Sequence, residues 1–234
     1  MVVLIALAIG YFVRPIPAKA PTPAPAAGAG ISLPPLQYVA NTDEYDIIAN
    51  YASSTPLLAS VGIVADASAV SSMRDFAAAT IAEFKTGVDP ARKGSLKIMY
   101  LISSSKQTIS YIFTTYQDTG GAHGNTFFRT FTYDTKTGAE LSIADIFKSG
   151  TDYLNKLSSI SRAKLPKIIG AGFDQSMMMN GTAPDTKNFQ NFFVDNNNLD
   201  LLFAPYDVAP YSAGPQTLAI PLADLSDILK PEYK

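Results

Sequence analysis

The stretch LKIMYLISSSKQTISYIFTTYQDTGGAHGNTFFRTFTY, residues 96–133, decides the fold. Residues 96–103 and 108–116 are rich in β-branched and aromatic side chains, and the polar residues 104–107 separate them, which predicts a β-hairpin. A third strand is predicted over residues 126–133, where side chains fall on two alternating faces. Strands joined by such short connections favour antiparallel pairing.

Two helices are predicted on either side of this stretch. Apolar residues recur at helical spacing over Ser68–Lys85, and Gly87 ends the pattern. A second helix is predicted over Tyr153–Lys164, and Pro166 is expected to stop it because proline lacks a backbone N–H. Further along, Met177–Met179 are expected to form a flexible apolar patch that leads into a turn.

The last third of the chain predicts three more strands. Residues Phe189–Val194 and Leu199–Phe203 read as strands, and residues 195–198 (DNNN) read as the turn between them, since Asn and Asp tolerate positive φ. A final strand is predicted over Thr217–Ile220, followed by a short helix over Leu222–Leu229.

These elements indicate an α+β fold, with helices packed on antiparallel β-sheet. They divide into two α/β halves, residues 38–138 and residues 139–234. Each half carries one long helix and only a few strands, so each would bury a small fraction of its surface if it folded alone. No linker rich in proline and glycine separates them. We therefore expect two closely packed halves that form one unit.

The N-terminal segment predicts a link to a membrane or to secretion. Residues 1–13 (MVVLIALAIGYFV) are apolar, which is shorter than the roughly 20 residues of a membrane span but fits the apolar region of a signal peptide. Residues 15–37 are rich in proline and alanine, which predicts a semi-rigid linker. We expect residues 1–14 to be a membrane anchor, or a signal segment whose cleavage releases the protein outside the cytoplasm. A buried core element is the alternative.

Composition excludes several classes of function. The chain has 18 Lys+Arg and 20 Asp+Glu, and this balance argues against a nucleic-acid partner. It has no cysteine, which excludes disulfides and thiolate metal sites, and its single histidine excludes a multi-histidine metal site. No metal and no cofactor is expected. Residues 166–234 carry four basic and eight acidic side chains, which favours a basic partner unless this is an ordinary solvated surface.

The glycine-rich loop TGGAHGN, residues 119–125, is the most distinctive motif. Its glycines allow positive φ and close approach of a ligand or of another backbone segment. The candidate ligand contacts in it are Gly121, His123 and Asn125. No G-x-S-x-G or other nucleophile signature accompanies the histidine, so no catalytic residue is assigned. A structural loop, a ligand contact and catalysis remain open for His123.

A second motif, YDVAPYSAGP over residues 206–215, predicts a stiff aromatic loop. Tyrosine offers a broad ring and a hydroxyl at low entropic cost, which suits the recognition of sugars or proteins. Tyr206 and Tyr211 are therefore candidate ligand contacts, and a packed connection between two strands is the alternative. Each loop ends the hairpin of one half of the chain, so we expect both to lie near the junction and to form one ligand surface.

Together with LSIADIF, residues 141–147, these two motifs resemble a known pair of extracytoplasmic domains of unknown function. The pair occurs in the lysozyme-sensing anti-sigma factor RsiV and in the N-terminal part of the peptidoglycan deacetylase PdaC. The resemblance covers residues 40–232 and implies a membrane-anchored α+β module that in the RsiV branch binds lysozyme. It implies neither anti-sigma activity nor deacetylation, because the chain shows no sigma-binding segment and no metal-dependent deacetylase domain.

We therefore expect a membrane-tethered binding module of the cell envelope that has no catalysis of its own. Its expected ligand is a cell-wall glycan or a wall-acting protein such as lysozyme. The alternative is a hydrolase of cell-wall material, in which His123 acts as general base beside a carboxylate that only the fold brings near. A purely structural envelope protein is the third hypothesis.

Overall fold

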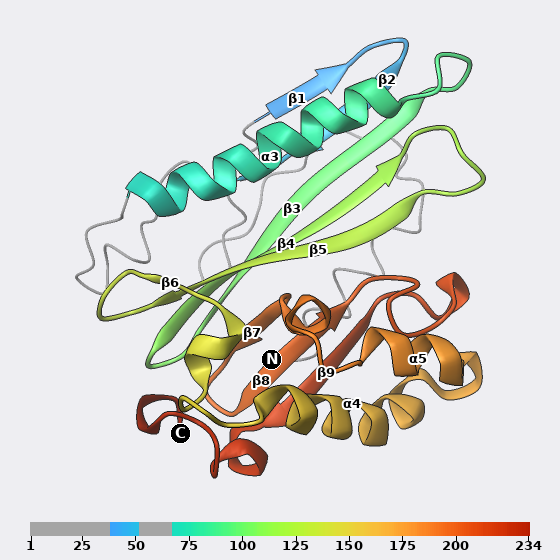
Figure 1. Cartoon of the computed structure of the whole chain (residues 1–234). Coiled ribbons are helices and arrows are strands. Elements are labelled where there is room, and N and C mark those ends of the chain that lie inside the picture. Colours follow the sequence, from blue (N-terminus) through green and yellow to red (C-terminus); the bar gives the residue numbers. More distant parts are fainter. Residues whose placement is uncertain (1–37, 52–66) are drawn as a thin grey trace, which may run out of the picture. The chain divides into compact units, whose positions relative to one another are not determined.

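A six-stranded sheet forms the first half of the computed structural model, which describes residues 38–51 and 67–234. Its strands lie side by side in chain order (Figure 1). They are β1 (Tyr38–Asn41), β2 (Tyr45–Ala49), β3 (Gly94–Ser104), β4 (Thr108–Asp118), β5 (Asn125–Asp134) and β6 (Glu140–Leu141). The hairpin and the third strand predicted around residues 96–133 are therefore present.

One strand pair differs from the antiparallel arrangement that we expected. Strands β2 and β3 run parallel, whereas the other neighbours in this sheet are antiparallel. A parallel pair needs a crossover connection, and helix α3 (Ala67–Gly87) lies between the two strands in the chain. The sheet is thus mixed, and the α+β class is confirmed.

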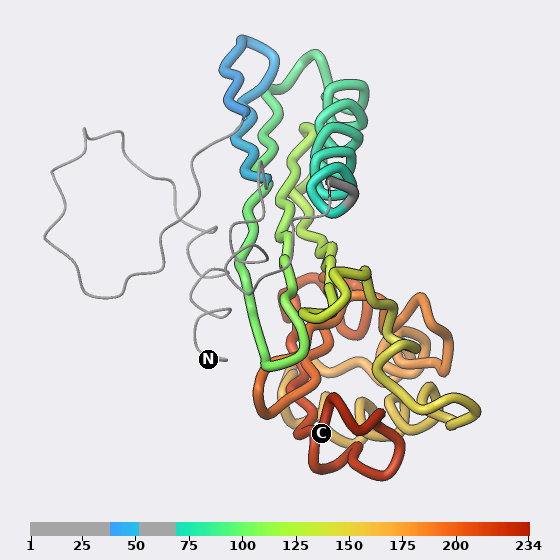
Figure 2. The backbone as a smooth tube through the Cα atoms, turned by 90° about the vertical axis from the view of Figure 1, so that its left-hand side faces the viewer, coloured from blue at the N-terminus to red at the C-terminus, as the bar shows by residue number. Residues whose placement is uncertain are grey.

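Helix α3 covers one face of the long strands (Figure 2). Its buried stripe follows the helical spacing predicted from the sequence and consists of Ala69, Met73, Ala77, Ile81 and Phe84. The stripe packs against side chains on the facing side of the sheet, which include Ile47, Leu96, Ile98, Tyr111, Phe113 and Phe131. Burial of this apolar surface stabilises the first half.

The second half of the chain forms a smaller antiparallel sheet, in the order β7-β8-β9. Its strands are β7 (Phe192–Val194), β8 (Asn198–Phe203) and β9 (Gln216–Pro221). Helices α4 (Tyr153–Ile169) and α5 (Gln175–Gly181) lie beside it (Figure 1). Their buried residues Leu157, Leu165 and Met178 join the core that the inward side chains of this sheet form.

Short 3₁₀ turns connect these elements. They are η2 (Ile143–Ile146), η3 (Gly170–Gly172), η4 (Thr186–Phe189), η5 (Tyr211–Ala213), η6 (Leu222–Leu225) and η7 (Pro231–Tyr233). The helix predicted over Leu222–Leu229 is therefore only one 3₁₀ turn at its start. Beyond it, Leu229 forms an isolated antiparallel bridge with Phe147, which ties the C-terminal segment to the start of the second half.

Two further elements of the second half differ from the prediction. Helix α4 continues through Pro166 and ends at Ile169, because Leu165 and Ile169 pack on the core and hold the last turn in place. The patch predicted over Met177–Met179 is part of helix α5, whose N-terminus is capped by Asp174. The Asp174 carboxylate accepts a hydrogen bond of 2.8 Å from the Met177 backbone N–H.

A row of hydroxyl groups joins the two sheets. Strand β7 is at the edge of its sheet, and the carbonyl groups on its outer side accept hydrogen bonds from threonines of β4 and β5. Thr108 donates to the Val194 carbonyl at 3.1 Å, and Thr132 donates to the Phe192 carbonyl at 3.2 Å. The Phe192 N–H donates to the Thr130 hydroxyl at 3.1 Å. We call these contacts the hydroxyl seam.

The alternation of side chains along β5 makes the seam possible. Phe131 and Tyr133 point to the face that helix α3 covers, and Thr130 and Thr132 point to the opposite face, where β7 lies. Ser110 of β4 lies opposite Thr132, and their hydroxyls are 3.0 Å apart. The seam is thus polar on a buried face, and its polar groups bond to backbone.

The described residues, 38–51 and 67–234, belong to one compact unit, in agreement with the close packing expected from the missing linker. The predicted anchor and linker, residues 1–14 and 15–37, lie outside the described residues. In the part of the chain that is described, no helix has the length and apolar character needed to cross a membrane.

Asp200 of β8 is a buried carboxylate. Its side chain is 1% exposed, and within residues 38–51 and 67–234 neither carboxylate oxygen accepts a hydrogen bond. Burial, together with the nearby charge of Asp195, raises the pKa of Asp200 to about 7. Ionisation of this group therefore opposes folding.

Replacing Thr132 with valine tests the hydroxyl seam. The substitution keeps the shape of the side chain but leaves the buried Phe192 carbonyl without its donor, so we expect the free energy of unfolding to fall by about 1–3 kcal/mol. Chemical denaturation measures this change. The control is Thr126→Val on the same face of β5, where no described residue bonds to the hydroxyl. Equal effects of the two substitutions would contradict a stabilising role of the seam.

Replacing Asp200 with asparagine tests the buried carboxylate. In the unfolded chain an aspartate titrates near pH 4, so the stability of the wild type should fall as the pH rises from about 4 to about 7. The variant cannot ionise here, and its advantage should grow by up to about 4 kcal/mol over this range. Denaturation at several pH values measures the difference, with the exposed Asp43→Asn as charge control. Parallel profiles for wild type and D200N would contradict the raised pKa.

Candidate functional site

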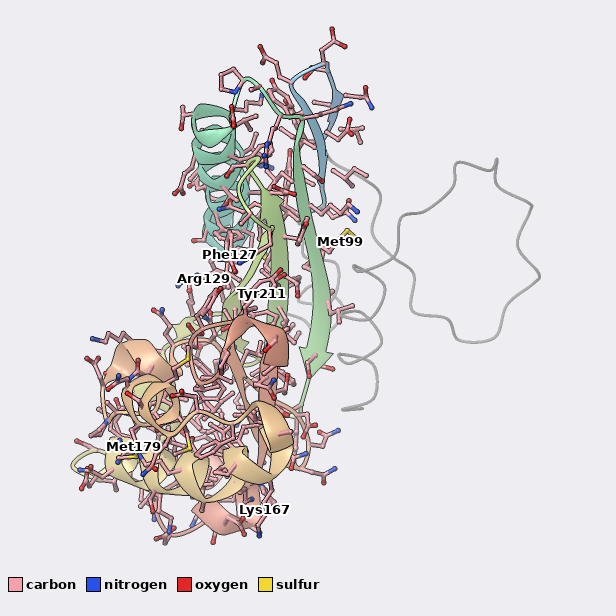
Figure 3. The ribbon with its side chains drawn as sticks, turned by 90° about the vertical axis from the view of Figure 1, so that its right-hand side faces the viewer. Met99, Phe127, Arg129, Lys167, Met179 and Tyr211 are labelled. Carbon is pink, nitrogen blue, oxygen red and sulfur yellow. The ribbon has the colours of Figure 1, made fainter. Side chains whose placement is uncertain are left out.

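The glycine-rich loop and the aromatic loop meet in the structure, as predicted. The ring of His123 stacks on the ring of Tyr211, with centroids 3.9 Å apart and planes 25° apart. Tyr206 lies beside both, with its ring centroid 6.3 Å from that of His123 and 5.7 Å from that of Tyr211. We call His123, Tyr206 and Tyr211 the aromatic cluster. Tyr211 lies where the two sheets meet (Figure 3).

Hydrogen bonds orient the three rings. The Nδ1 atom of His123 lies 3.0 Å from the Gly124 carbonyl, which can only accept, so Nδ1 carries the proton of the neutral ring. The Nε2 atom is then an acceptor, and the Tyr206 hydroxyl donates to it at 3.3 Å. The Tyr211 hydroxyl donates to the same Gly124 carbonyl at 2.7 Å. One backbone carbonyl thus holds two rings in place.

Gly124 is required at this position by close approach. A Cβ atom there would collide with the ring and hydroxyl of Tyr116 on β4. Burial raises the pKa of the Tyr116 hydroxyl, and the neighbouring Asp118 adds to the shift. The glycine lets the loop lie flat on the tyrosine, and this packing directs the carbonyl toward His123 and Tyr211.

The start of the glycine-rich loop is held by Arg92. Its guanidinium donates to the Gly120 carbonyl at 3.0 Å and to the Gly121 carbonyl at 3.2 Å. Gly120 has a φ of 94°, which L-residues with a side chain rarely adopt. Its N–H donates to the Asp118 carboxylate at 2.9 Å. These contacts fix the first part of the loop, and the residues that follow it in the chain belong to the aromatic cluster.

Tyr206 combines exposure with an unfavourable backbone conformation. It is 51% exposed, and its φ of 74° lies in the left-handed region. It is the only non-glycine residue with positive φ in the described part of the chain. The Asp207 carboxylate accepts from the Ala204 N–H at 2.6 Å, and the Tyr206 N–H donates to the Ala209 carbonyl at 3.1 Å, which fixes this turn. The conformation costs roughly 1–2 kcal/mol.

The structure brings together three of the five residues predicted as ligand contacts. His123, Tyr206 and Tyr211 form the cluster, whereas Gly121 and Asn125 are exposed and make only local or loop-holding hydrogen bonds. The Asn125 side chain accepts from the N–H of the following residue at 2.9 Å.

Sequence reasoning missed two residues that shape the site, Gly124 and Tyr116. The third glycine of the TGGAHGN motif was a signal for the first of them, since it is needed for close approach. Nothing local in the sequence distinguishes Tyr116 from the other aromatic residues of β4, because its role depends on a loop that follows the strand.

The chemistry available to His123 is limited to its hydrogen-bond partners. The ring bonds to a carbonyl and to a tyrosine hydroxyl, and no carboxylate of the described residues bonds to it. A histidine that acts as general base beside an orienting acid needs such a carboxylate. Over the same residues, no group of three or more His, Cys, Asp or Glu side chains could hold a metal ion.

Comparison with known families confirms the resemblance stated from the sequence. Residues 144–223 match the family described as "Protein of unknown function (DUF3298)". Two crystal structures of this family have related folds. The protein from Bacteroides fragilis has a TM-score of 0.53, 19% identity and coverage of 80% of this chain and 84% of its own. The Pseudomonas aeruginosa protein has a TM-score of 0.50, 18% identity and coverage of 88% and 98%.

Among proteins of known name, the peptidoglycan-N-acetylmuramic acid deacetylase PdaC of Bacillus subtilis is 40% identical over 143 residues, which are 61% of this chain and 31% of PdaC. The esterase Rv3036c of Mycobacterium tuberculosis is 27% identical over 114 residues, 49% of each protein. The immunogenic protein MPT64 of the same species is 26% identical over 122 residues, 52% of each. The chain thus spans between 31% and 52% of the length of these relatives.

Replacing Gly124 with alanine should disrupt the aromatic cluster. The added Cβ collides with Tyr116, so the loop must move and the hydrogen bonds from Tyr211 and His123 to the Gly124 carbonyl are lost. We expect large chemical-shift changes for the His123 ring protons. The matched control is Gly121→Ala, where a Cβ meets no atom within 4 Å and the shifts should stay close to those of the wild type. Equal shifts in the two variants would contradict this account of the site.

Proposed function

We propose that this chain is a binding module of the cell envelope that recognises a cell-wall glycan through the aromatic cluster, without catalysis of its own. The observation that carries the proposal is Tyr206. Half of its side chain is exposed and its backbone is in a costly conformation, so neither core packing nor local preference accounts for a tyrosine at this position. Strained residues of this kind concentrate at functional sites.

The cluster is organised for contact through its ring faces. The polar atoms of His123 and the Tyr211 hydroxyl bond within the cluster or to Gly124, so these groups need no further partner. Their positions are set before a ligand arrives, which lowers the entropic cost of binding. Sugar rings present apolar C–H faces that pack on aromatic rings, and a tyrosine adds a hydroxyl at the rim.

The relatives supply the envelope context. PdaC acts on peptidoglycan by its name, and the region shared with it covers 61% of this chain. A module that binds the same polymer would hold the attached protein close to the wall. We further propose that residues 1–14 tether the module to the membrane, or direct its secretion, so that residues 38–234 act outside the cytoplasm.

Two other functions each have one observation in their favour and can be distinguished from glycan binding by experiment. A wall-acting protein such as lysozyme was the second ligand expected from the sequence, and the acidic residues of positions 166–234 are the observation in its favour. A hydrolase is favoured by the relative named as an esterase. The hydrogen bonds of His123 weigh against a hydrolase, since no described carboxylate or serine bonds to its ring.

The proposal is tested by titrating the full chain, in mild detergent, with soluble peptidoglycan glycan strands freed of peptide. We expect binding heat, and Tyr206→Asn should weaken the affinity at least about tenfold because it removes an exposed ring. Asparagine tolerates the left-handed region, so the variant should be as stable as the wild type or more stable. Tyr206→Phe keeps the ring and should retain most of the affinity.

Three outcomes would replace the proposal. Heat with lysozyme but none with glycan would assign the cluster to a protein partner. Hydrolysis of p-nitrophenyl acetate that His123→Ala abolishes would assign it to catalysis. Glycan affinity that Tyr206→Asn leaves unchanged would place the glycan site elsewhere on the chain.

A further inference from the structure

Helix α3 and the β1–β2 edge of the large sheet border an open cavity of about 290 Å³. Its lining consists of Tyr38, Tyr51, Arg74, Ala78, Ile81, Ala82 and Lys85. The five α3 residues form one stripe along the helix, which adjoins the stripe buried on the sheet and shares Ile81 with it. Two alanines in this stripe leave the space open. We call this site the α3 cavity.

The charges of the α3 cavity are all positive. Arg74 and Lys85 line it, and none of its other lining residues is acidic. They are eleven positions apart on α3, about 16 Å along the helix axis, so one cation lies toward each end of the stripe. A negatively charged ligand is therefore the electrostatic complement of this cavity.

The guanidinium of Arg74 is available for such a ligand. No residue of the described chain forms a hydrogen bond or ion pair with it. A guanidinium presents paired N–H donors whose geometry matches a carboxylate, and it stays charged at any physiological pH. A carboxylate that enters the cavity thus meets a cation with its full donor set unused.

The ammonium group of Lys85 has a different role, because it is already positioned. Its Nζ atom donates to the Tyr38 hydroxyl at 2.8 Å and lies 5.2 Å from the centroid of the Tyr38 ring and 5.6 Å from that of Tyr45. The hydrogen bond to Tyr38 raises the pKa of Lys85, which keeps it charged. The Tyr38 hydroxyl accepts this bond, so its own proton remains free for an acceptor on a ligand.

We infer that the α3 cavity binds a single carboxylate-bearing sugar unit, with Arg74 pairing the carboxylate and Tyr38 and Tyr51 contacting the sugar. The size of the cavity favours one ring, since it is near the lower limit of about 300 Å³ for small-molecule sites. The lining combines two tyrosines, an apolar floor and two cations, which matches a ring with C–H faces, hydroxyls and one acidic group. This inference rests on the proposed function and names the acidic sugar of the glycan as a second contact.

The test compares two sugars that differ by one carboxylate-bearing lactyl group. N-acetylmuramic acid carries a lactyl carboxylate on the ring that N-acetylglucosamine also has. Titration of the full chain by NMR should show saturable shifts at α3 residues with the first sugar and at least about tenfold weaker binding of the second. Acetate alone should not reproduce the effect, because the ring contributes to binding. Equal binding of both sugars, or of acetate and N-acetylmuramic acid, would overturn the inference.

Variants distinguish binding in the α3 cavity from nonspecific attraction of a negatively charged sugar to the positive charges of the protein. Arg74→Gln removes the pairing cation at an exposed position and should weaken N-acetylmuramic acid at least about tenfold. Lys167→Gln on α4 removes the same charge elsewhere and should leave binding unchanged (Figure 3). Ala78→Leu keeps a good helix former and fills the cavity, so it should also abolish binding. An Arg74→Gln variant that binds like the wild type would refute the site, whatever Ala78→Leu does.

Failure of this inference is distinguishable from failure of the proposed function. If Tyr206→Asn weakens binding of glycan strands while Arg74→Gln has no effect on N-acetylmuramic acid, the aromatic cluster is a glycan site and the α3 cavity is not. If Arg74→Gln abolishes binding of the acidic sugar while Tyr206→Asn has no effect on glycan strands, the cavity stands and the role of the aromatic cluster fails.

Discussion

The edge of strand β7 imposes the constraint on which the arrangement of the two halves depends. A strand edge that is buried must have its outward carbonyl and N–H groups hydrogen-bonded, because each orphaned group costs free energy comparable to a lost bond. Here threonine hydroxyls of the large sheet supply the partners, at Thr108, Thr130 and Thr132. Such bonds are directional, and they couple the register of one sheet to that of the other. Apolar contact alone would allow the sheets to slide.

The candidate site is a consequence of this coupling. The seam engages the ends of β4 and β5 near Thr108 and Thr132, while the loop that joins these strands carries Gly124. Once the second half is fixed against the strands, the loop around Tyr206 and Tyr211 lies against His123. The aromatic cluster therefore needs both halves, although each half has its own hydrophobic core.

Strain and exposure set the cluster apart from the cores. In the cores, aromatic rings are buried and make many apolar contacts, as Phe113 does with Phe76, Tyr100 and Phe131. In the cluster, the Gly124 carbonyl accepts from two rings and Tyr206 keeps an unfavourable φ. The cost of that conformation is offset by stability elsewhere in the unit. The α3 cavity is also set apart, because alanines occupy positions on the helix where larger side chains would close it.

The sequence by itself determined the elements whose signal is local. Helix α3 and strands β3, β4 and β5 were predicted from side-chain periodicity. Side chains of the same face recur every 3.6 residues in a helix and every 2 residues in a strand, and this pattern can be seen in the sequence alone. The two loops of the candidate site were recognised for the same reason, because glycine and tyrosine have conformational and chemical properties that do not depend on neighbours far away in the chain.

Only the tertiary structure decided the features that depend on residues distant in the sequence. The parallel pairing of β2 and β3, the continuation of α4 through Pro166 and the helix at Met177–Met179 each rest on packing against other elements. The contact of Gly124 with Tyr116 and the burial of Asp200 are of the same kind. Local preferences amount to about 1 kcal/mol per residue or less, and to about 3 kcal/mol for a proline inside a helix. The burial of one apolar side chain contributes about 2 kcal/mol, so several buried side chains together outweigh the local preference where the two conflict.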